Sequence, residues 1–520
     1  MERYLVGVDI GSGGCKVSVI DLKTKRVETR SREYPTYYPR PGWAEQKPED
    51  WVSAASFLTK SILAKKSTIA SEIIAIGLSG VTHSPVILDK NGSPISRSIH
   101  LTDIRSQKEA NYLKERLGEE ILKATMNDVN VMWTAPMLLW IKNHKPEVWN
   151  KIRHVIFPKD YVRYRLTGEI ATDHIDAEGS LLYNTHSRSW DERFLSILGL
   201  KPNQLPLILN PTDISGKVTT EGYRIFGFKE GTPVITGSTD TLLEVFASGC
   251  RNPGDCTVKL ATFGRICVIS DKPIFDEKLI TYSYIYPGMF YPGTGTKSFA
   301  SSLRWFRDRF FKSRSQIEKG NPSIEPQNNE IDLSSKAYNL MEKEAENVPP
   351  GSEGLIFHPY LQGEGSPYND PKLRGGFFGI TLRHGPPHFI RAILEGTSFS
   401  ILDSMNFIRE KNLTVREPIR LIGGGTKNRL WTEILIDVLG MEGIIPPAMD
   451  PSSGAALLAG VGTGVFSSLE EAQGFLFENQ ESINFKPEKH TLYKKLFNLY
   501  KVAHDKMLEV YHGLADFGSG

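Results

Sequence analysis

One pattern occurs in both halves of the chain and constrains the fold more than any other feature. In the first half, the apolar alternation of residues 6–10 leads through a Gly-Ser-Gly-Gly tip into a second strand at 17–20. In the second half, a strand at 257–260 leads through a small-residue turn at 261–264 into a strand at 265–269. Two such hairpins indicate a duplicated architecture with mixed α/β structure. Coincidence is the alternative, because glycine-tipped hairpins are common.

Length and charge narrow the classes of protein that the chain can belong to. Its 520 residues exceed what one hydrophobic core serves, so two large domains or three small ones are expected. A composition of 40% hydrophobic and 23% charged residues is that of a globular protein. With 62 Lys and Arg against 60 Asp and Glu, the formal charge of +2 gives no basic excess for binding nucleic acid.

Cysteine usage and hydropathy predict a cytoplasmic protein. The four cysteines form no CxxC pair and are too few for a disulfide framework, so free thiols in a reducing compartment are expected. The first residues lack the cationic and apolar regions of a cleavable signal. The longest uncharged stretch, 451–469, is too rich in glycine and serine to span a bilayer.

An acidic residue stands directly before the first glycine-rich tip. Asp9 ends the apolar strand, and Ser12, Gly13 and Lys16 follow in the turn. Backbone N–H groups of such a tip can approach a polyphosphate, while Asp9 can hold Mg²⁺ directly or through water and Lys16 adds a positive charge. The alternative is ordinary turn chemistry, in which an acidic residue precedes a glycine turn.

A second glycine cluster suits phosphate or ribose. The apolar strand 419–422 runs into Gly-Gly-Gly-Thr-Lys-Asn, and a helical stretch follows at 430–439. The cluster is not a dinucleotide fingerprint, because Asn428 stands where the third glycine is required. The alternative is a tight strand-to-helix connection. The segment 293–298 resembles a phosphate-binding loop of the Walker A type, but Thr296 stands where that motif requires glycine, so a loop that enters a helix is expected there.

Other polar residues follow short predicted strands. Asp240 comes after the strand 233–235 and before an apolar helical stretch, which predicts a carboxylate at a helix N-terminus facing a cleft; an N-cap role is the alternative. Thr82-His83 and Asp103 lie beside or beyond short strands, where a core histidine and a surface turn are the alternatives. A charged, Asn- and Ser-rich stretch at 312–336 predicts a surface loop.

In their order along the chain, these segments resemble the FGGY carbohydrate kinases, and among them the xylulokinases most closely. The resemblance covers nearly the whole chain. The matching segments are Asp9 to Lys16, Trp43-Ala44-Glu45-Gln46 with Pro48 and Trp51, Pro158-Lys159-Asp160-Tyr161, Leu166-Thr167-Gly168-Glu169, Pro359 to Glu364, Phe377-Phe378-Gly379, Arg391 to Gly396, and Gly423-Gly424-Gly425.

The resemblance implies an α/β fold of two actin-like, ribonuclease-H-like domains with an active-site cleft between them. Residues 1–250 are expected to bind the sugar and carry the catalytic aspartate, and residues 251–520 to bind the nucleotide. The implied reaction is phosphorylation of a terminal hydroxyl of a small sugar or polyol by ATP with Mg²⁺, with D-xylulose converted to D-xylulose 5-phosphate. No nucleic acid or membrane partner is expected. A homodimer stays open, because no heptad repeat specifies an oligomeric state.

The family's functional residues carry over to matching positions of this chain. Asp240 corresponds to the catalytic base, while Asp9 stays the residue expected from its position before the glycine-rich tip to hold Mg²⁺. The sugar side corresponds to Thr82, His83, Asp103 and Asp240. The nucleotide side corresponds to Ser12, Gly13, Lys16, Thr262, Gly264, Gly424 and Asn428.

Several departures from the family pattern leave the substrate open. Met137 stands where the family carries lysine, Leu101-Thr102 replaces an aromatic residue and an amide, and Thr82 replaces methionine. Phe263 and Arg265 replace smaller residues in the second hairpin, which bears on ATP affinity. The alternatives are a kinase for ribulose, glycerol, erythritol or gluconate, a non-catalytic sugar-binding regulator, or an actin-like polymerising ATPase.

Overall fold

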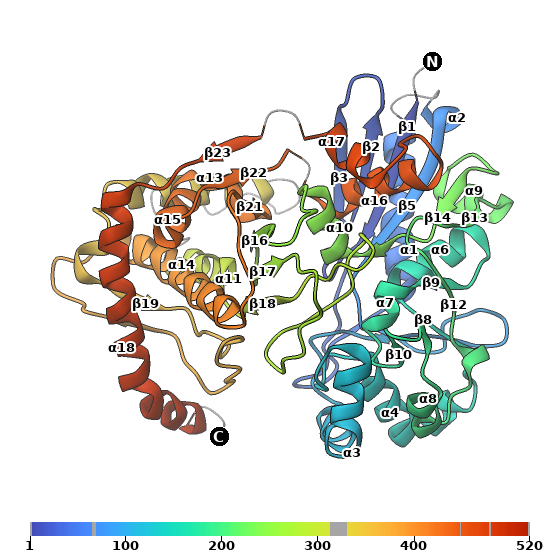
Figure 1. Cartoon of the computed structure of the whole chain (residues 1–520), viewed down its shortest axis with the longest axis horizontal. Helices are drawn as coiled ribbons and strands as arrows, with labels where there is room; N and C mark the ends of the chain where they lie inside the picture. The colour runs from blue at the N-terminus through green and yellow to red at the C-terminus, as the bar shows by residue number, and fades with distance from the viewer. Residues whose placement is uncertain (1–2, 65–68, 312–329, 448, 478–479, 518–520) are drawn as a thin grey trace, which may run out of the picture. The chain divides into compact units, whose positions relative to one another are not determined.

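The computed structural model describes residues 3–64, 69–311, 330–447, 449–477 and 480–517, without the side chains of 330–335. Within it the chain forms two units (Figure 1). Unit 1 comprises Met1–Arg251, Asp271–Tyr291 and Pro447–Glu478, and unit 2 comprises Asn252–Ser270, Pro292–Pro446 and Asn479–Gly520. The chain first leaves unit 1 next to the expected boundary at residue 250, but two later segments return to it. The assignment of sugar to the first half and nucleotide to the second stays a prediction.

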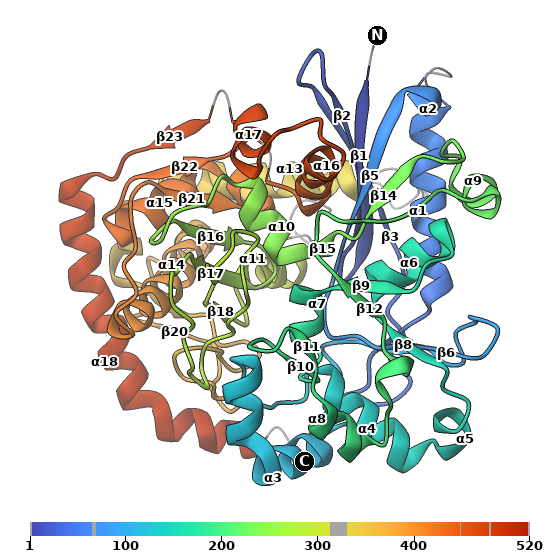
Figure 2. The same ribbon diagram turned by 45° about the vertical axis from the view of Figure 1, so that its right-hand side comes forward.

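The centre of unit 1 is a seven-stranded sheet (Figure 2). Its strand order is β13-β14-β5-β1-β2-β3, and β15 pairs with β5. The β1–β2 hairpin is antiparallel, as the sequence predicts, and β5 runs parallel to β1. The bounds are β1 (Tyr4–Ile10), β2 (Gly14–Asp21), β3 (Val27–Glu33), β5 (Ile73–Gly80), β13 (Ile214–Lys217), β14 (Pro233–Ile235) and β15 (Ser238–Thr239).

Strand β1 is buried on both faces because helices cover both sides of it. Its even-numbered apolar residues join a core with α1 (Pro48–Leu63), centred on Trp51. On the other face, Gly7 and Gly77 lie against α16 (Pro451–Gly462). A Cβ atom on Gly7 would lie 1.8 Å from the Ser452 carbonyl oxygen, and one on Gly77 would lie 2.0 Å from that of Ala455. Only glycine at both positions allows this helix to approach the sheet so closely.

Smaller elements complete unit 1. The short strands are β4 (Glu45–Gln46), β6 (Val86–Leu88), β7 (Ser98–Ile99), β8 (His154–Ile156), β9 (Ala171–Asp173), β10 (Tyr183–Asn184), β11 (Ser189–Trp190) and β12 (Leu207–Leu209). The helices are α2 (Ile69–Glu72), α3 (Gln107–Thr125), α4 (Thr134–His144), α5 (Pro146–Trp149), α6 (Pro158–Thr167), α7 (His174–Glu178), α8 (Glu192–Leu198), α9 (Thr220–Phe226), α10 (Asp240–Ala247) and α17 (Leu469–Phe475), with the 3₁₀ turn η1 (Pro202–Gln204).

Unit 2 repeats the central arrangement of unit 1. Its six-stranded sheet has the order β18-β17-β16-β21-β22-β23. The β16–β17 hairpin is antiparallel and β21 runs parallel to β16, as β5 does to β1. The bounds are β16 (Cys256–Leu260), β17 (Gly264–Val268), β18 (Gly293–Thr296), β21 (Ile419–Ile422), β22 (Gly443–Ile445) and β23 (Glu481–Ile483). The duplicated α/β architecture inferred from the two hairpins is therefore confirmed.

Helices of different lengths, two short strands and three helical turns complete unit 2. They are α11 (Ala300–Phe306), α13 (Glu330–Glu346), α14 (Pro386–Glu410), α15 (Arg429–Leu439) and α18 (Pro487–Phe517), with β19 (Ile356–His358), β20 (Gly376–Phe378) and the helical turns η2 (Arg307–Phe311), η3 (Ser352–Gly354) and η4 (Gly424–Lys427). Most of the loop predicted at 312–336 lies outside the described residues, but from Glu330 onward the chain is helical, so the prediction is wrong there.

Two further expectations from the sequence can be compared with the described residues. The four cysteines are buried free thiols. No described helix has the length and apolar character to cross a membrane.

Because α16 contacts the sheet so closely, two glycine substitutions in unit 1 should differ sharply in their effect on stability. Gly7→Ala should destabilise the protein by about 1–3 kcal/mol, because the new methyl group overlaps the backbone of α16. Gly474→Ala is the control, because no atom lies within 4 Å of its added Cβ and alanine favours the helix. Urea unfolding followed by tryptophan fluorescence measures both. Equal midpoints for the two variants would contradict the close contact.

Candidate active site

Asp9 lies at the end of β1 between two neighbouring strands. In register, it stands beside Lys16 on β2 and Ser79 on β5. Its carboxylate is buried, and Oδ1 accepts a hydrogen bond of 2.8 Å from the Ser79 hydroxyl. The tip residues Ser12 and Gly13, by contrast, are exposed. The hairpin therefore presents an open tip of small residues above a buried carboxylate, which is the arrangement that the sequence predicts.

Negative charge gathers around Asp9. Burial, followed by the charges of Asp450 and Asp240, raises the pKa of Asp9 to about 8, while Ser79 and Lys16 oppose the rise. Lys16 forms an ion pair with Asp450, with 2.5 Å between Nζ and Oδ2. Burial alone would lower the pKa of Lys16, but the ion pair outweighs it and the pKa is raised. Three carboxylates near one ammonium group make a site that favours a further cation.

Asp450 was not among the site residues predicted from the sequence. It is the N-cap of α16, where its Oδ1 accepts hydrogen bonds from the Ser452 backbone N–H (3.0 Å) and hydroxyl (2.6 Å). The signal that could have found it is the Asp-Pro pair before an apolar helical run, which marks a helix start. Its pairing with Lys16, far away in the sequence, had no such signal.

Asp240 begins α10, but it is not the N-cap. Thr239 holds that position and accepts a hydrogen bond of 3.2 Å from the Leu242 N–H, so the N-cap alternative for Asp240 is wrong. Oδ1 of Asp240 accepts a hydrogen bond of 2.6 Å from the Thr241 N–H. Among the described residues, none donates a hydrogen bond to its Oδ2. The half-buried carboxylate thus keeps one oxygen for a ligand.

A buried ionic cluster holds the segment before Asp240. The Ser238 hydroxyl donates to Asp173 Oδ1 at 2.8 Å, and β15 pairs with the end of β5. Lys159 Nζ lies 3.0 Å from Asp173 Oδ2 and 3.1 Å from Asp176 Oδ2. The same ammonium group lies 2.7 Å from Asp160, whose carboxylate also pairs with Arg163 at 3.0 Å. Although Lys159 and Asp160 belong to a segment that matches the family, the sequence assigned neither a role.

Electrostatics explains how so many charges are tolerated without water. The carboxylates raise the pKa of Lys159 although its burial opposes this, so the ammonium group stays charged. Burial raises the pKa of Asp176, although Lys159 lowers it, so burial reduces the negative charge that this carboxyl adds to the cluster. The ammonium and guanidinium groups offset the charge of the remaining carboxylates, as a buried network requires.

His83 is buried in an aromatic corner. Its Nδ1 lies 3.1 Å from the Gly179 carbonyl oxygen, and its Nε2 lies 3.4 Å from the Tyr282 hydroxyl. The ring packs edge-on against Trp133, with 4.5 Å between centroids. Its backbone has φ +74°, an uncommon conformation for a residue with a side chain. Neighbouring Thr82 is also buried.

Asp103 is 1% exposed, so the surface-turn alternative is wrong. Its Oδ2 accepts from the Ala44 N–H at 2.6 Å, and the Arg105 guanidinium forms an ion pair of 2.7 Å with it. Arg105 also pairs with Glu45 at 2.9 Å and lies 3.7 Å over the Trp43 ring. These bonds tie Asp103 to the segment 43–45, which also matches the family.

The four predicted nucleotide residues of unit 2 lie on two adjacent turns. The β16–β17 tip carries Thr262 and Gly264, and the turn after β21 carries Gly424 and Asn428. The turns are close because β16 and β21 are paired, and a Cβ on Gly423 would lie 2.8 Å from the Leu260 carbonyl oxygen. Gly424 is exposed, with no atom within 4 Å of an added Cβ.

The second turn leads into a helix, as the sequence predicts. Asn428 is the N-cap of α15, and its Oδ1 accepts a hydrogen bond of 2.8 Å from the Trp431 N–H. The turn therefore combines an exposed glycine, Gly424, with a helix N-terminus, which suits an anionic group. The loop expected at 293–298 is wrong in part, because 293–296 form strand β18 by pairing with β17.

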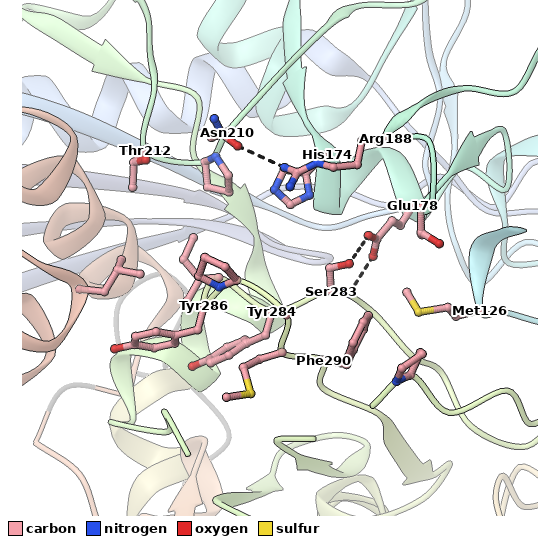
Figure 3. A pocket seen from close by; sticks show the side chains of 18 of the residues that line it. Met126, His174, Glu178, Arg188, Asn210, Thr212, Ser283, Tyr284, Tyr286 and Phe290 are labelled. Atoms are coloured by element: carbon pink, nitrogen blue, oxygen red, sulfur yellow. Dashed lines mark hydrogen bonds between the residues drawn. The ribbon is translucent and has the colours of Figure 1, made fainter. Parts of the chain in front are cut away.

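A separate cavity of about 630 Å³ lies within unit 1 and contains none of the predicted site residues in its wall (Figure 3). Glu178 lines it and accepts hydrogen bonds from the Ser283 N–H at 2.8 Å and hydroxyl at 2.5 Å. The next residue, Gly179, contacts His83 through its carbonyl oxygen. The turn after α7 thus connects the cavity wall to His83.

Comparison with known proteins gives the same family over both halves. Residues 4–247 match the N-terminal domain of the FGGY family of carbohydrate kinases, and residues 265–463 match its C-terminal domain. The chain is 29% identical over 517 residues to a xylulose kinase of Lactococcus lactis, covering 99% of each chain. It is 29% identical over 527 residues to a gluconokinase of Bacillus subtilis, covering 100% of this chain and 99% of the other. The crystal structure of a ligand-bound xylulose kinase from Lactobacillus acidophilus is similar with a TM-score of 0.84 at 26% identity, covering 98% of this chain and 100% of that one.

The buried carboxyl of Glu178 should make the free energy of unfolding decrease as pH rises. Burial raises its pKa from the ordinary 4.5 to about 8, against the opposing hydrogen bonds of Ser283. Between these two values the unfolded state has lost the proton that the folded state keeps, so stability decreases with pH over this interval and levels off above about 8. Glu178→Gln is neutral and keeps the hydrogen-bonding shape, so its melting temperature should exceed that of the wild type by a margin that grows from pH 5 to pH 8. A margin that is constant with pH would contradict the assignment.

Proposed function

Because the chain belongs to the FGGY family of carbohydrate kinases, we propose that it transfers the γ-phosphoryl group of ATP to a terminal hydroxyl of D-xylulose, forming D-xylulose 5-phosphate. The observation that carries this proposal is the pair of aspartates in unit 1: Asp9 at the buried end of β1, and Asp240 at the N-terminus of α10, whose Oδ2 accepts no hydrogen bond from the described residues. The similarity to a xylulose kinase over 99% of the chain supports D-xylulose as a candidate sugar.

Asp240 is proposed as the base that orients the reacting hydroxyl and accepts its proton. In phosphoryl transfer such a carboxylate contributes mainly by positioning the hydroxyl and by receiving its proton late in the transfer. The oxygen that does not bond to Thr241 would accept the sugar hydroxyl. The Ser238–Asp173 hydrogen bond and the pairing of β15 with β5 hold the backbone before it, so the carboxylate has little freedom to move.

Asp9 is proposed to hold Mg²⁺, directly or through water. The charge balance fits such an ion, because the negative charges of Asp450 and Asp240 both act on Asp9, while the positive charge of Lys16 and the hydrogen bond of Ser79 oppose them. The described residues include no cluster of three or more metal-ligating side chains, but Mg²⁺ usually takes one or two carboxylates and completes its shell with water and substrate phosphates. When bound, Mg²⁺ would neutralise the charge on the phosphate oxygens.

The remaining residues are proposed to bind the two substrates. On the sugar side are Thr82, His83 and Asp103. On the nucleotide side are Ser12, Gly13, Lys16, Thr262, Gly264, Gly424 and Asn428. The exposed small-residue tip at Ser12 and Gly13 is suited to phosphate oxygens, and at the second tip Thr262 offers a hydroxyl beside the exposed Phe263. Asp103 differs from the others, because its carboxylate already binds Arg105 and Ala44, and a sugar hydroxyl would have to share it.

Gluconate is a second candidate substrate. The gluconokinase of B. subtilis matches the chain at the same 29% identity and over its full length, so similarity alone does not separate the two sugars. Ribulose, glycerol and erythritol also remain candidate substrates, because Thr82, Met137 and residues 101–102 differ from the family pattern. A regulator without turnover would bind sugar in a saturable manner and release no ADP.

We expect Asp240→Asn to lower kcat by about 10²–10⁴, because the variant keeps the shape of the side chain but loses the proton acceptor. Coupled ADP release with MgATP measures this against D-xylulose, gluconate, L- and D-ribulose, glycerol and erythritol. Asp271→Asn, an exposed residue of unit 1, makes the same chemical change and should leave turnover intact. Saturable sugar binding without ADP release in the wild type would overturn the kinase assignment.

The buried serine behind the base gives a second prediction. Ser238→Ala should lower kcat about tenfold with little change in the KM for ATP, because a lost hydrogen bond of about 1.4 kcal/mol loosens the segment that carries Asp240. Ser215→Ala on β13 is the matched control, since the one partner of that hydroxyl in the described part of the chain is the Val234 carbonyl oxygen, at 3.4 Å. If both variants lose stability equally and neither changes kcat, Ser238 has no positioning role.

A further inference from the structure

The backbone of the first hairpin tip is held from one side by three hydrogen bonds. They end on the carbonyl oxygens of three consecutive residues, Gly11, Ser12 and Gly13. The Tyr34 hydroxyl donates to Gly11, and the Tyr34 backbone N–H donates to Gly13 at 3.3 Å. The side-chain amide of Gln46 donates to Ser12 at 2.7 Å. All three bonds end on main-chain atoms, so they fix the backbone of the tip rather than its side chains.

The orientation of the Gln46 amide follows from its other neighbour. Its Oε1 accepts a hydrogen bond of 3.1 Å from the Trp51 indole N–H, which can only donate. The amide oxygen therefore faces Trp51, and Nε2 faces both Ser12 and the Thr36 hydroxyl, which is 2.9 Å away. Trp51 is fully buried and belongs to the hydrophobic core of unit 1. Gln46 thus connects the tip to that core.

The positions of Gln46 and Tyr34 are themselves fixed by strand pairing and burial. Gln46 is buried and ends β4, where it pairs with Ser98 on β7. Tyr34 is buried and directly follows β3, which pairs with β2 along its length. Burial raises the pKa of the Tyr34 hydroxyl well above its ordinary value. The hydroxyl therefore keeps its proton at neutral pH and can donate it to Gly11.

These bonds decide where the N–H groups of the tip point. In a planar trans peptide, the carbonyl oxygen of one residue and the N–H group of the next point in opposite directions. Because the oxygens are held from one side, the N–H groups of Ser12 and Gly13 face the other side. In the described part of the chain, neither N–H group donates to an acceptor, and both residues are exposed. Two adjacent donors are therefore oriented and open to an oxygen ligand.

We propose that Gln46 and Tyr34 are positioning residues, which orient the N–H groups of Ser12 and Gly13 toward a terminal phosphate group of the nucleotide. This role rests on the proposed function, in which the tip binds ATP. Neither side chain needs to touch the nucleotide, because each acts on the carbonyl side of the peptide groups. A turn that is already held in its binding conformation loses less conformational entropy when the phosphate binds, so the affinity is higher.

The neighbourhood of the tip indicates which phosphate groups it would contact. Asp9, proposed above to hold Mg²⁺, ends the strand that leads into the tip. Gly11 lies close to it, since a Cβ added there would lie 3.5 Å from Asp9 Oδ2. In kinases the metal ion bridges oxygens of the β- and γ-phosphates. The tip is therefore expected to contact the metal-bound end of the triphosphate, which AMP lacks.

Nucleotide binding by two variants tests this role. Gln46→Met keeps the length of the side chain but cannot donate to Ser12, and Tyr34→Phe removes only the hydroxyl that donates to Gly11. By isothermal titration calorimetry with Mg²⁺, each variant should bind AMP-PNP, a non-hydrolysable ATP analogue, about tenfold more weakly than the wild type, the effect of one lost hydrogen bond. The Kd for AMP should be unchanged, whereas a general loss of structure would weaken the binding of both nucleotides.

Two substitutions elsewhere in unit 1 make the same chemical changes and serve as controls. Gln473 is a buried glutamine whose Nε2 donates to the Phe246 and Cys250 carbonyl oxygens at 2.8 and 2.9 Å. Its Oε1 accepts from the Tyr286 hydroxyl at 2.7 Å. Tyr284 is a buried tyrosine whose hydroxyl donates to the Cys250 carbonyl oxygen at 2.7 Å. Gln473→Met and Tyr284→Phe should bind AMP-PNP as tightly as the wild type.

The outcomes separate this role from the proposed function. If Gln46→Met and Tyr34→Phe bind AMP-PNP as the wild type does, or lose AMP affinity to the same extent, the positioning role is overturned and the proposed function stands. A wild type that binds no AMP-PNP would overturn the proposed function and the positioning role with it. If far-UV circular dichroism shows that Gln46→Met does not fold, Tyr34→Phe decides, because it keeps every carbon atom of the side chain.

Discussion

The close approach of α16 to the central sheet of unit 1 is the contact on which the proposed site depends. Gly7 and Gly77 leave room for the backbone of this helix, and any Cβ there would overlap its carbonyl oxygens. Because the helix lies there, its N-cap Asp450 is close enough to form an ion pair with Lys16 on β2. Through that ion pair, packing on one face of β1 sets the charge around Asp9 at the end of the same strand.

The buried ionic cluster around Lys159 is a second constraint on the proposed site. The cluster around Lys159 is sealed from water, so its carboxylates must face cations or remain protonated. One of those carboxylates, Asp173, both caps α7 and accepts the hydrogen bond of Ser238. The segment before Asp240 is thereby joined to a network that is costly to rearrange. Rigid support of this kind is what phosphoryl transfer by positioning requires.

The two hairpins, the strand at 419–422 and the helix after Asn428 could be predicted because each is a local pattern. Alternation of period two, a small-residue turn and a helix-capping residue depend only on neighbours in the chain. The order of the matching segments along the chain could also be recognised from the sequence, and this order predicted the family. The loop at 312–336 was wrong from Glu330 onward, because polar composition does not exclude a helix packed against others in its unit.

The sequence by itself determined the duplicated α/β architecture, the family and the positions of two aspartates at element ends. Only the tertiary structure decided which groups surround them. Asp450 meets Lys16, and Asp173 meets Ser238, across many intervening residues. It also decided that Thr239 rather than Asp240 caps α10, and that one face of α18 stays outside the core. The physical reason is that burial and charge pairing depend on distances in space, whereas patterns in the sequence report only neighbours along the chain.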